Sequence, residues 1–164
     1  MPDIRIEEWS LKYVESYREC LGSVARERVY LGLIGLPAEE ETRSFLGSNP
    51  GLIQYFALER ETVIGWCDIR PRTLPGFTHA GVLGMGVLAP YRRRGLGRLL
   101  METCVEKAWK SGLIRIELEV FASNEIAIAL YENLGFKIEG RNVRARYLDG
   151  VWDDVIWMGL LRDV

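Results

Sequence analysis

The sequence predicts a single α/β domain built around one central mixed sheet. The chain has 164 residues, of which 48% are hydrophobic, and this is enough for one well-buried core but too little for two. Short stretches alternate apolar and polar residues as strands do, and others repeat apolar residues every three or four positions as helices do. No repeat or low-complexity segment interrupts this pattern, so we expect residues 1–164 to fold as one unit.

The first half of the chain is expected to begin with a strand, continue through helices and end in a hairpin. Ser10 can cap the helix that follows it, and proline is favourable in a first helical turn. Glu59-Arg60-Glu61 separates two apolar stretches of strand character, which indicates a hairpin. The expected elements are a strand at Ile4 and Ile6, a helix from Ser10 to about Gly22, an irregular helical region to Gly35, a helix from Pro37 through Leu46, and paired strands Leu52–Leu58 and Thr62–Ile69.

The second half is expected to alternate strands and helices and to end in another hairpin. Pro90 is unfavourable within a sheet and should follow a strand end. Gly112 and Gly135 are typical of helix C-termini, and Asp149-Gly150 is a strong hairpin turn. The expected elements are a loop over Pro71–Phe77, a strand over Val82–Leu88, a helix from Leu96 to Gly112, a strand over Ile114–Phe121, a helix from about Asn124 to Gly135, and two strands flanking Asp149-Gly150.

Composition argues against several classes of protein. A formal charge of −2 gives no general reason to expect a nucleic acid or an anionic membrane as partner. Cys20, Cys67 and Cys104 are scattered and form no Cys-x-x-Cys pair, so we expect buried thiols and neither a metal site nor a disulfide framework. The N-terminus lacks the layout of a signal peptide, and no apolar run approaches the ~20 residues of a membrane helix. We therefore expect a cytoplasmic protein.

An Arg-x-x-Gly-x-Gly pattern lies between the strand expected to end at Leu88 and the following helix. A helix N-terminus presents N–H groups without intrahelical acceptors, and its partial positive charge favours an anion. Glycine lets the backbone approach a phosphate closely, and the arginines add positive charge. The alternative is a basic helix start that is only solvated. The residues of this candidate phosphate site are Arg92, Arg93, Arg94, Gly95, Leu96, Gly97 and Arg98.

Two other interpretations of this region are weaker. The segment Gly84–Ala89 fits the Gly-x-Gly-x-x-Ala dinucleotide fingerprint. That fingerprint needs a turn directly into a helix, whereas Pro90 and a second loop follow here. The run Arg92-Arg93-Arg94 could contact nucleic acid, but no basic surface with interleaved aromatic residues accompanies it. We therefore expect neither NAD nor a nucleic acid as a ligand.

Three polar residues follow the candidate phosphate site in the sequence. Asn124 and Tyr131 are seven residues apart and so share one stripe of the expected helix. Glu119 lies on the polar side of the preceding strand. Each has an ordinary structural alternative, because Tyr131 suits a core, Asn124 suits an N-cap and Glu119 suits a solvent-facing strand position. Their joint arrangement indicates an acid–base pair beside a nucleotide phosphate.

Together these blocks resemble the GNAT superfamily of acetyl-CoA-dependent N-acetyltransferases, nearest the branch of ribosomal-protein alanine N-acetyltransferases and related small-molecule enzymes. The family's Gln/Arg-x-x-Gly-x-Gly/Ala signature falls on Arg92–Gly97, and its Asn-x-x-Ala-x-x-Leu-Tyr-x-x-x-Gly-Phe pattern falls on Asn124–Phe136. The resemblance implies acetyl-CoA as co-substrate and the GNAT fold, with a mostly antiparallel, twisted sheet of about seven strands flanked by about four helices. The cofactor-binding residues that it implies are Met85, Gly86, Val87, the segment Arg92–Arg98, Asn124 and Tyr131.

The same resemblance implies the chemical roles. Tyr131 would protonate the departing CoA thiolate. Glu119, twelve residues earlier, would be the base, directly or through a water molecule. Many family members carry a glutamate base in the preceding strand, but Gly81-Val82-Leu83 contains no acid. His79 is therefore kept as a further candidate for the base.

These roles imply direct transfer of the acetyl group to a primary amine. Cys104, on the core face of its helix, is a poor nucleophile, so we expect no acyl-enzyme. The alternative is a non-catalytic acyl-CoA-binding sensor or regulatory module. The acceptor is left open between a small amine, an amino acid or analogue, and a protein N-terminus. Residues that could shape its site are Glu27, Arg28, Tyr30, Arg146 and Tyr147.

The last hairpin carries several apolar residues near an expected sheet edge. Exposed edges of this kind are usually covered, so we expect a homodimer. The residues concerned are Val151, Trp152, Val155, Ile156 and Trp157.

Overall fold

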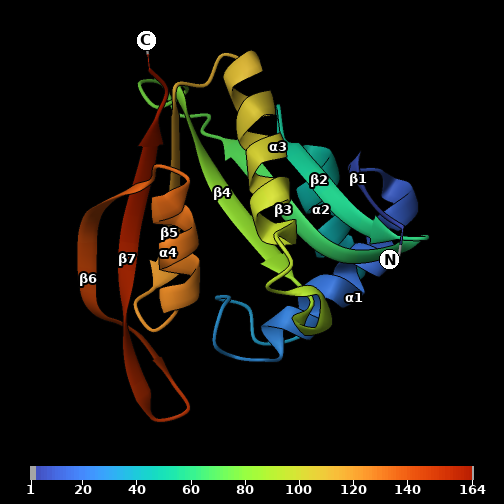
Figure 1. Ribbon diagram of the computed structural model, residues 1–164, viewed down its shortest axis with the longest axis horizontal. Coiled ribbons are helices and arrows are strands. Elements are labelled where there is room, and N and C mark those ends of the chain that lie inside the picture. The colour runs from blue at the N-terminus through green and yellow to red at the C-terminus, as the bar shows by residue number, and fades with distance from the viewer. Residues whose placement is uncertain (1–2, 164) are drawn as a thin grey trace.

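The fold is a seven-stranded mixed sheet with helices on both faces, seen in a computed structural model that describes residues 3–163 (Figure 1). Its order is β1-β2-β3-β4-β5-β7-β6, and every neighbouring pair is antiparallel except β4 and β5. The strands are β1 (Ile4–Glu8), β2 (Ile53–Glu59), β3 (Thr62–Pro71), β4 (Ala80–Val87), β5 (Arg115–Phe121), β6 (Lys137–Leu148) and β7 (Val151–Leu161).

The helices form a layer on each side of this sheet. Those within residues 3–163 are α1 (Val14–Ala25), α2 (Glu39–Ser48), α3 (Leu96–Lys110) and α4 (Glu125–Asn133), with short 3₁₀ turns η1 (Leu11–Tyr13) and η2 (Ala89–Tyr91). α1 and α2 cover one face, and α3 and α4 cover the other (Figure 1). None of these helices is both long and apolar enough to cross a bilayer. The predicted fold class, with its mixed sheet and four helices, is confirmed.

Each face of the sheet has its own hydrophobic core. On the face covered by α3 and α4, Leu100 and Cys104 of α3 are fully buried. On the opposite face, the Tyr17 ring of α1 lies 5.0 Å from the Phe56 ring and 5.8 Å from the Trp66 ring. β3 is thus covered on both sides, which explains why it is apolar along most of its length.

β4 and β5 separate partway along their length. Register pairs join only Ala80–Val82 to Arg115–Glu117, whereas β5 pairs along its full length with β7 on its other side. Beyond these pairs the two strands diverge (Figure 1). Within the described residues, the edge of β4 at Met85–Val87 therefore has no strand beside it on that side. Because unpaired backbone groups need other partners, this split can receive a ligand.

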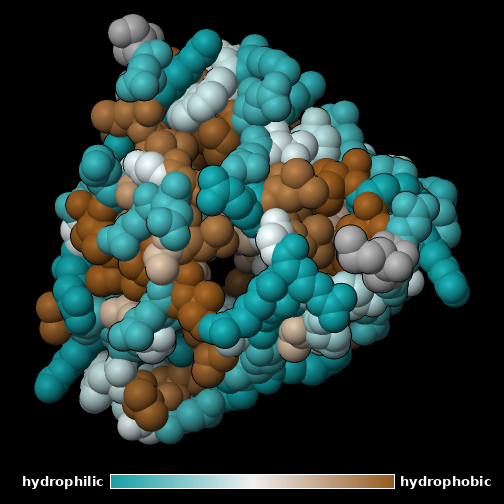
Figure 2. Space-filling model, viewed as in Figure 1, coloured by the Kyte–Doolittle hydropathy of each residue, from teal (hydrophilic) through white to brown (hydrophobic). Residues whose placement is uncertain are grey.

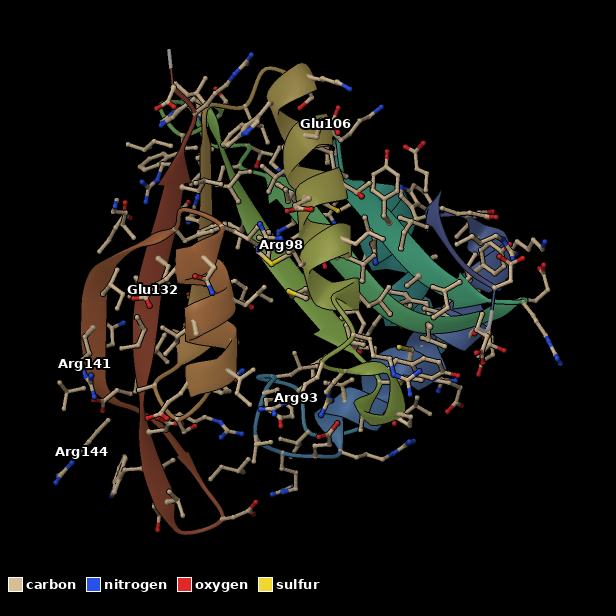
Figure 3. The ribbon with its side chains drawn as sticks, viewed as in Figure 1. Arg93, Arg98, Glu106, Glu132, Arg141 and Arg144 are labelled. Atoms are coloured by element: carbon tan, nitrogen blue, oxygen red, sulfur yellow. The ribbon has the colours of Figure 1, made fainter. Side chains whose placement is uncertain are left out.

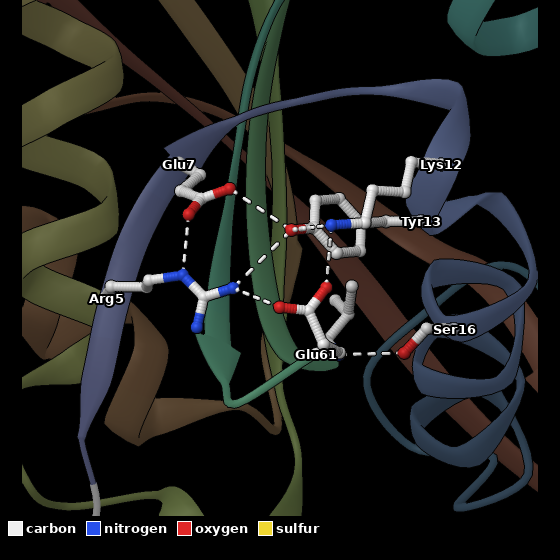
Figure 4. A network of polar contacts seen from close by, with 7 residues as sticks. Arg5, Glu7, Lys12, Tyr13, Ser16 and Glu61 are labelled. Carbon is white, nitrogen blue, oxygen red and sulfur yellow. Dashed lines mark hydrogen bonds and ion pairs between the residues drawn. The ribbon is translucent and has the colours of Figure 1, made fainter.

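A network of polar side chains joins the N-terminal strand to the rest of the molecule (Figure 4). Glu61, in the turn between β2 and β3, accepts from Arg5 Nη2 at 2.9 Å and pairs with Lys12 Nζ at 2.8 Å. The hydroxyl of Ser16 in α1 accepts the backbone N–H of Val63 at 2.8 Å. Since the charged groups are partly exposed, the network orients β1 and α1 more than it stabilises them.

The prediction of an irregular helical region up to Gly35 is wrong. Residues 26–38 contain turns, bends and backbone without regular structure, and Arg28 has a left-handed φ of 64°, which breaks a helix. α1 instead continues through Gly22, where a Cβ would lie 2.7 Å from Leu36 Cδ1. The glycine predicted to end the helix thus makes room for the following loop to pack on it.

Apart from the start of α1, which lies four residues after the predicted Ser10, the other boundaries differ from the predictions by no more than two residues, and two shifts are instructive. α2 begins at Glu39 and not at Pro37, because Ala38 is still extended with ψ of 145°. Ser10 caps the 3₁₀ turn and not α1 itself, since its side chain accepts the N–H of Lys12 at 3.3 Å.

The expectation for the last hairpin also needs correction. β7 lies inside the sheet between β5 and β6, so Val155 and Ile156 are buried core residues and Trp157 is half-buried. The edge strand is β6. Its exposed apolar residues near the hairpin turn, together with those of β7, are Val143, Tyr147, Val151 and Trp152.

Candidate active site

A cleft of about 310 Å³ lies where β4 and β5 have separated. It is bounded by the end of β4, the turn before α3, and α4. Figure 2 shows the corresponding face hollowed near its centre, with hydrophobic and hydrophilic residues around the opening. The predicted residues that line the cleft are Met85, Gly86, Val87, Arg92, Arg93, Gly95, Gly97, Arg98, Asn124 and Tyr131. Further lining residues that the sequence did not single out include Val24 and Ile126.

The turn before α3 is shaped to present backbone N–H groups. Arg93 and Gly95 have left-handed φ values of 62° and 79°. Alternating conformations of this kind turn successive N–H groups toward one point and form an anion-binding concavity. The first N–H groups of α3, from Leu96 onward, add unsatisfied donors and the positive end of the helix dipole. This geometry suits a phosphate.

The arginines of this turn differ in their surroundings. Arg92 is already engaged, because its Nε donates to Val87 O at 2.8 Å and its Nη1 to Glu27 Oε2 at 2.8 Å. Arg98 donates to Glu102 at 2.8 Å but is half-exposed. Arg93 forms no ion pair with any residue between 3 and 163. Figure 3 shows Arg93 and Arg98 near the start of α3, where an anion would meet them.

Two residues of the predicted phosphate site lie outside the lining of the cleft. Leu96 is 8% exposed and belongs to the core on the α3 face. The guanidinium of Arg94 lies 5.9 Å from the centre of the Tyr91 ring. The side chain of Leu96 thus packs the first turn of α3 against the core and leaves only the backbone of this residue for contact with a ligand.

α4 brings a polar cap and a buried phenol to the cleft. The side chain of Asn124 accepts the N–H of Ala127 at 3.2 Å, so it is the N-cap of α4 and also a lining residue. Tyr131 is 8% exposed. Burial raises the pKa of Tyr131 above its ordinary value of 10.0, with a smaller effect from Cys67. The phenol is therefore neutral near pH 7 and able to donate a proton.

The two candidate bases lie in different places. Glu119 is an exposed residue of β5, opposite Trp157 of β7, and is not among the residues that line the cleft. His79 precedes β4, and its carbonyl accepts the N–H of Ile114 at 3.0 Å. It lies six residues from Met85, which corresponds to roughly 20 Å along an extended strand. A group at the split is therefore out of direct reach of His79.

A second cavity of about 650 Å³ lies on the α1–α2 side of the sheet. Its walls include Tyr17 of α1, Phe45 of α2, and Trp66 and Asp68 of β3. Met85 lines both this cavity and the cleft, so the two spaces approach each other at β4. Asp68 was not predicted as a site residue, although a lone acid in the apolar run of β3 was a signal that could have revealed it.

The residues suggested for an acceptor site mostly have structural partners. Arg28 Nε donates to Asp149 Oδ2 at 2.8 Å, and Arg146 Nη2 donates to the backbone carbonyl of Arg28 at 2.7 Å. These contacts fasten the loop after α1 to the β6–β7 hairpin. Tyr30 lines the cleft, and its ring lies 4.8 Å from the guanidinium of Arg92.

The structure also bears on the alternatives of the sequence analysis. Gly84–Val87 lies within β4, and α3 begins only at Leu96, so the dinucleotide fingerprint lacks its required direct turn from strand to helix. Cys104 is fully buried, and its thiol donates to Cys67 O at 3.2 Å. Neither feature offers a second reactive centre in the cleft.

Comparison with known proteins gives a consistent result. The family model described as the acetyltransferase (GNAT) family matches residues 10–136. L-amino acid N-acetyltransferase AaaT of Escherichia coli K12 is 28% identical over 142 residues, which are 84% of this chain and 87% of that protein. [Ribosomal protein bS18]-alanine N-acetyltransferase of Salmonella typhimurium is 46% identical over 57 residues, 35% of this chain and 38% of that protein.

Solved structures have the same fold. A GNAT-family acetyltransferase from Streptococcus pneumoniae superposes with a TM-score of 0.90 at 30% identity and covers 98% of this chain and 100% of that one. A phosphinothricin acetyltransferase from Sinorhizobium meliloti, solved in complex with AcCoA, has a TM-score of 0.90 at 20% identity, covering 98% of this chain and 89% of that one.

Proposed function

Because the chain belongs to the acetyltransferase (GNAT) family and is an acetyl-CoA-dependent N-acetyltransferase, we propose that it moves the acetyl group directly to a primary amine at the split between β4 and β5. The observation that carries this proposal is the cleft that joins the unpaired edge of β4, the turn before α3 and the buried Tyr131. We propose that the predicted residues lining this cleft bind acetyl-CoA; they are Met85, Gly86, Val87, Arg92, Arg93, Gly95, Gly97, Arg98, Asn124 and Tyr131.

The cleft has complementary parts for the co-substrate. The left-handed turn at Arg93 and Gly95, with the first N–H groups of α3, would hold phosphate. Arg98 would add charge, whereas Arg92 would act by holding the turn against the end of β4. The free edge of β4 offers backbone donors and acceptors to an extended arm that carries amides.

A backbone N–H group at the end of β4 is also suited to polarise the carbonyl group of the thioester. Leu88 N donates to Ile64 O of β3 at 2.9 Å. N–H groups of consecutive strand residues point in opposite directions, so the N–H of Val87 points away from β3 and into the split. A donor there would stabilise the negative charge that develops on a carbonyl oxygen under attack.

Two side chains would move the protons. The attacking amine must be neutral, and we assign its deprotonation to Glu119 acting through water, because Glu119 lies on β5 at the split but outside the cleft lining. The nitrogen then bonds to the acetyl carbon while the carbon–sulfur bond breaks. Tyr131 would give its proton to the departing thiolate, whose conjugate acid has an ordinary pKa near 8.5.

Relatives and surface features support finer proposals on acceptor, location and assembly. The matched proteins are named for an amino acid and for a ribosomal protein as acceptors, which favours an α-amine. We place the protein in the cytoplasm. We also propose a homodimer through the hairpin surface of Tyr147, Val151 and Trp152. Light scattering that gives only the monomer mass at tens of micromolar would rule out this assembly.

Turnover with a panel of amines tests the proposed function. The panel contains L-amino acids, small amines without a carboxylate, and short peptides with free N-termini. Release of free thiol from acetyl-CoA is measured for each amine, and mass spectrometry identifies the acetylated product. We expect amine-dependent thiol release. Binding of acetyl-CoA without release for any amine would favour the sensor instead.

A further inference from the structure

A row of side chains crosses the sheet at the level where β4 and β5 separate. Register pairs place Gln54 of β2 opposite Asp68 of β3, and Asp68 opposite Gly84 of β4. Paired residues of antiparallel strands project to the same face, here the α1–α2 face. Asp68 is 8% exposed and lines the second cavity, so its carboxylate is removed from bulk solvent but faces an open space.

The carboxylate of Asp68 is compensated only in part for its burial, by the charge of Arg70 and by a hydrogen bond from Trp66. It forms no salt bridge with any residue described by the structure. The side-chain amide of Gln54 beside it is buried and forms no hydrogen bond with a residue in the range 3–163. The other titratable or charged groups that line this cavity are Tyr17 of α1, Glu41 of α2 and Arg70 of β3. A buried acid without a counter-ion is costly and rare, which points to a ligand.

Gly84 leaves room for that ligand beside the acetyl-transfer point. A Cβ on Gly84 would lie 3.2 Å from Asp68 Oδ2, so the carboxylate lies over a strand position that has no side chain. The next residue along β4 is Met85, which lines both cavities. A group held by Asp68 is therefore adjacent to the split.

An opposite charge lies on the same strand and the same face. Arg70 is two residues beyond Asp68, about 7 Å along the strand, and lines the same cavity. Its guanidinium lies 6.0 Å from the centre of the Phe45 ring. Arg70 and Asp68 do not pair with each other, since no salt bridge in residues 3–163 includes either one. The two side chains can thus bind a molecule that carries one cationic and one anionic group.

We propose that Asp68 binds the ammonium group and Arg70 the carboxylate of an α-amino acid acceptor with an apolar side chain. An amino acid places these two groups on one carbon, and it would bridge the unpaired charges. The remaining walls of the cavity are largely apolar and aromatic, with Leu21, Leu31 and Phe45 among them. This inference rests on the proposed function and specifies its acceptor.

The test compares two acceptors that differ only in the carboxylate, L-phenylalanine and 2-phenylethylamine. In the parent we expect kcat/KM to be higher for L-phenylalanine. Arg70→Met should lower kcat/KM at least about tenfold for L-phenylalanine, through KM, and leave 2-phenylethylamine nearly unchanged. Asp68→Asn should lower it at least about tenfold for both acceptors. The affinity for acetyl-CoA should not change in either variant.

Glu40→Gln is the matched control, because it removes a charge from α2 at an exposed position outside the cavity lining. Equal losses for both acceptors in Arg70→Met, or parent kinetics in Asp68→Asn, would overturn the assignment. So would a parent enzyme that acetylates amines but no amino acid.

A parent that releases no thiol with any amine would instead contradict the proposed function. Whether Asp68 and Arg70 bind an amino acid is then tested by calorimetric titration of the CoA-loaded protein with L-phenylalanine. Loss of binding in both variants supports the pair, and binding equal to that of the parent rejects it.

Discussion

Replacing Gly95 with alanine isolates the contribution of the turn before α3. Gly95 has φ of +79°, and apart from its chain neighbours no described residue has an atom within 4 Å of the position that a Cβ would take. Alanine therefore fits the space but must adopt a left-handed conformation, which costs an L-residue roughly 1–2 kcal/mol. For a chain of this size the loss corresponds to a Tm lower by about 2–8 °C. Rotation of the peptide to relieve the strain would turn N–H groups away from the cleft.

We expect Gly95→Ala to weaken acetyl-CoA binding at least about tenfold, or 1.4 kcal/mol. Gly112→Ala is the control, because Gly112 follows the other end of α3, has φ of +98° and also faces open space. It should lose similar stability and keep the parent affinity. Calorimetric titration with acetyl-CoA and a thermal melt of each variant make the comparison. Equal affinities in the two variants would refute the role of the turn.

Two further variants address the proton transfers. Tyr131→Phe removes only the buried hydroxyl, so kcat should fall roughly 10- to 1000-fold while acetyl-CoA affinity changes little; full kcat with the true acceptor would make water the acid. Glu119→Gln should shift the pH–rate profile to higher pH, because the amine must then lose its proton to solvent; an unchanged profile would remove Glu119 as the base.

The elements that the sequence predicted best are those whose signals are local. α3 repeats apolar residues on one face and ends near a glycine, α4 begins at the capping Asn124, and Asp149-Gly150 forms the hairpin turn. The turn before α3 was predictable for the same reason, since the segment Arg92–Gly97 combines loop and helix start in consecutive residues.

What the sequence could not reveal depends on contacts between distant segments. Gly22 looked like a helix end, but the helix continues because Leu36 packs on that glycine. The cavity that we propose for the acceptor is assembled from α1, α2, β3 and β4, and no short motif joins Asp68 to Gly84 before the register of the strands is known. The separation of β4 from β5, which opens the cleft, is likewise a property of the pairing and not of either strand.

The buried carboxylate of Asp68 should make stability depend on pH in a measurable way. Burial raises its pKa from 3.8 to about 7, although the Arg70 guanidinium and a hydrogen bond from Trp66 oppose this. The native state therefore holds this proton up to about pH 7, whereas the unfolded state releases it near pH 4. Because the native state binds more protons across this window, the stability due to the protonated form is present below pH 4 and is lost as pH rises to about 7.

A rise in the pKa of Asp68 from 3.8 to about 7 corresponds to about 4 kcal/mol of unfolding free energy. Asp68→Asn cannot ionise, so the difference in unfolding free energy between variant and parent should rise in favour of the variant from pH 4 to 7 by up to that amount and then level off. Urea unfolding of both proteins at several pH values measures it, and other titrating groups cancel in the difference. Parallel curves would mean that Asp68 ionises normally. A rising difference would mean that the parent retains an acid that destabilises it near neutral pH, as expected of a side chain kept for binding and not for stability.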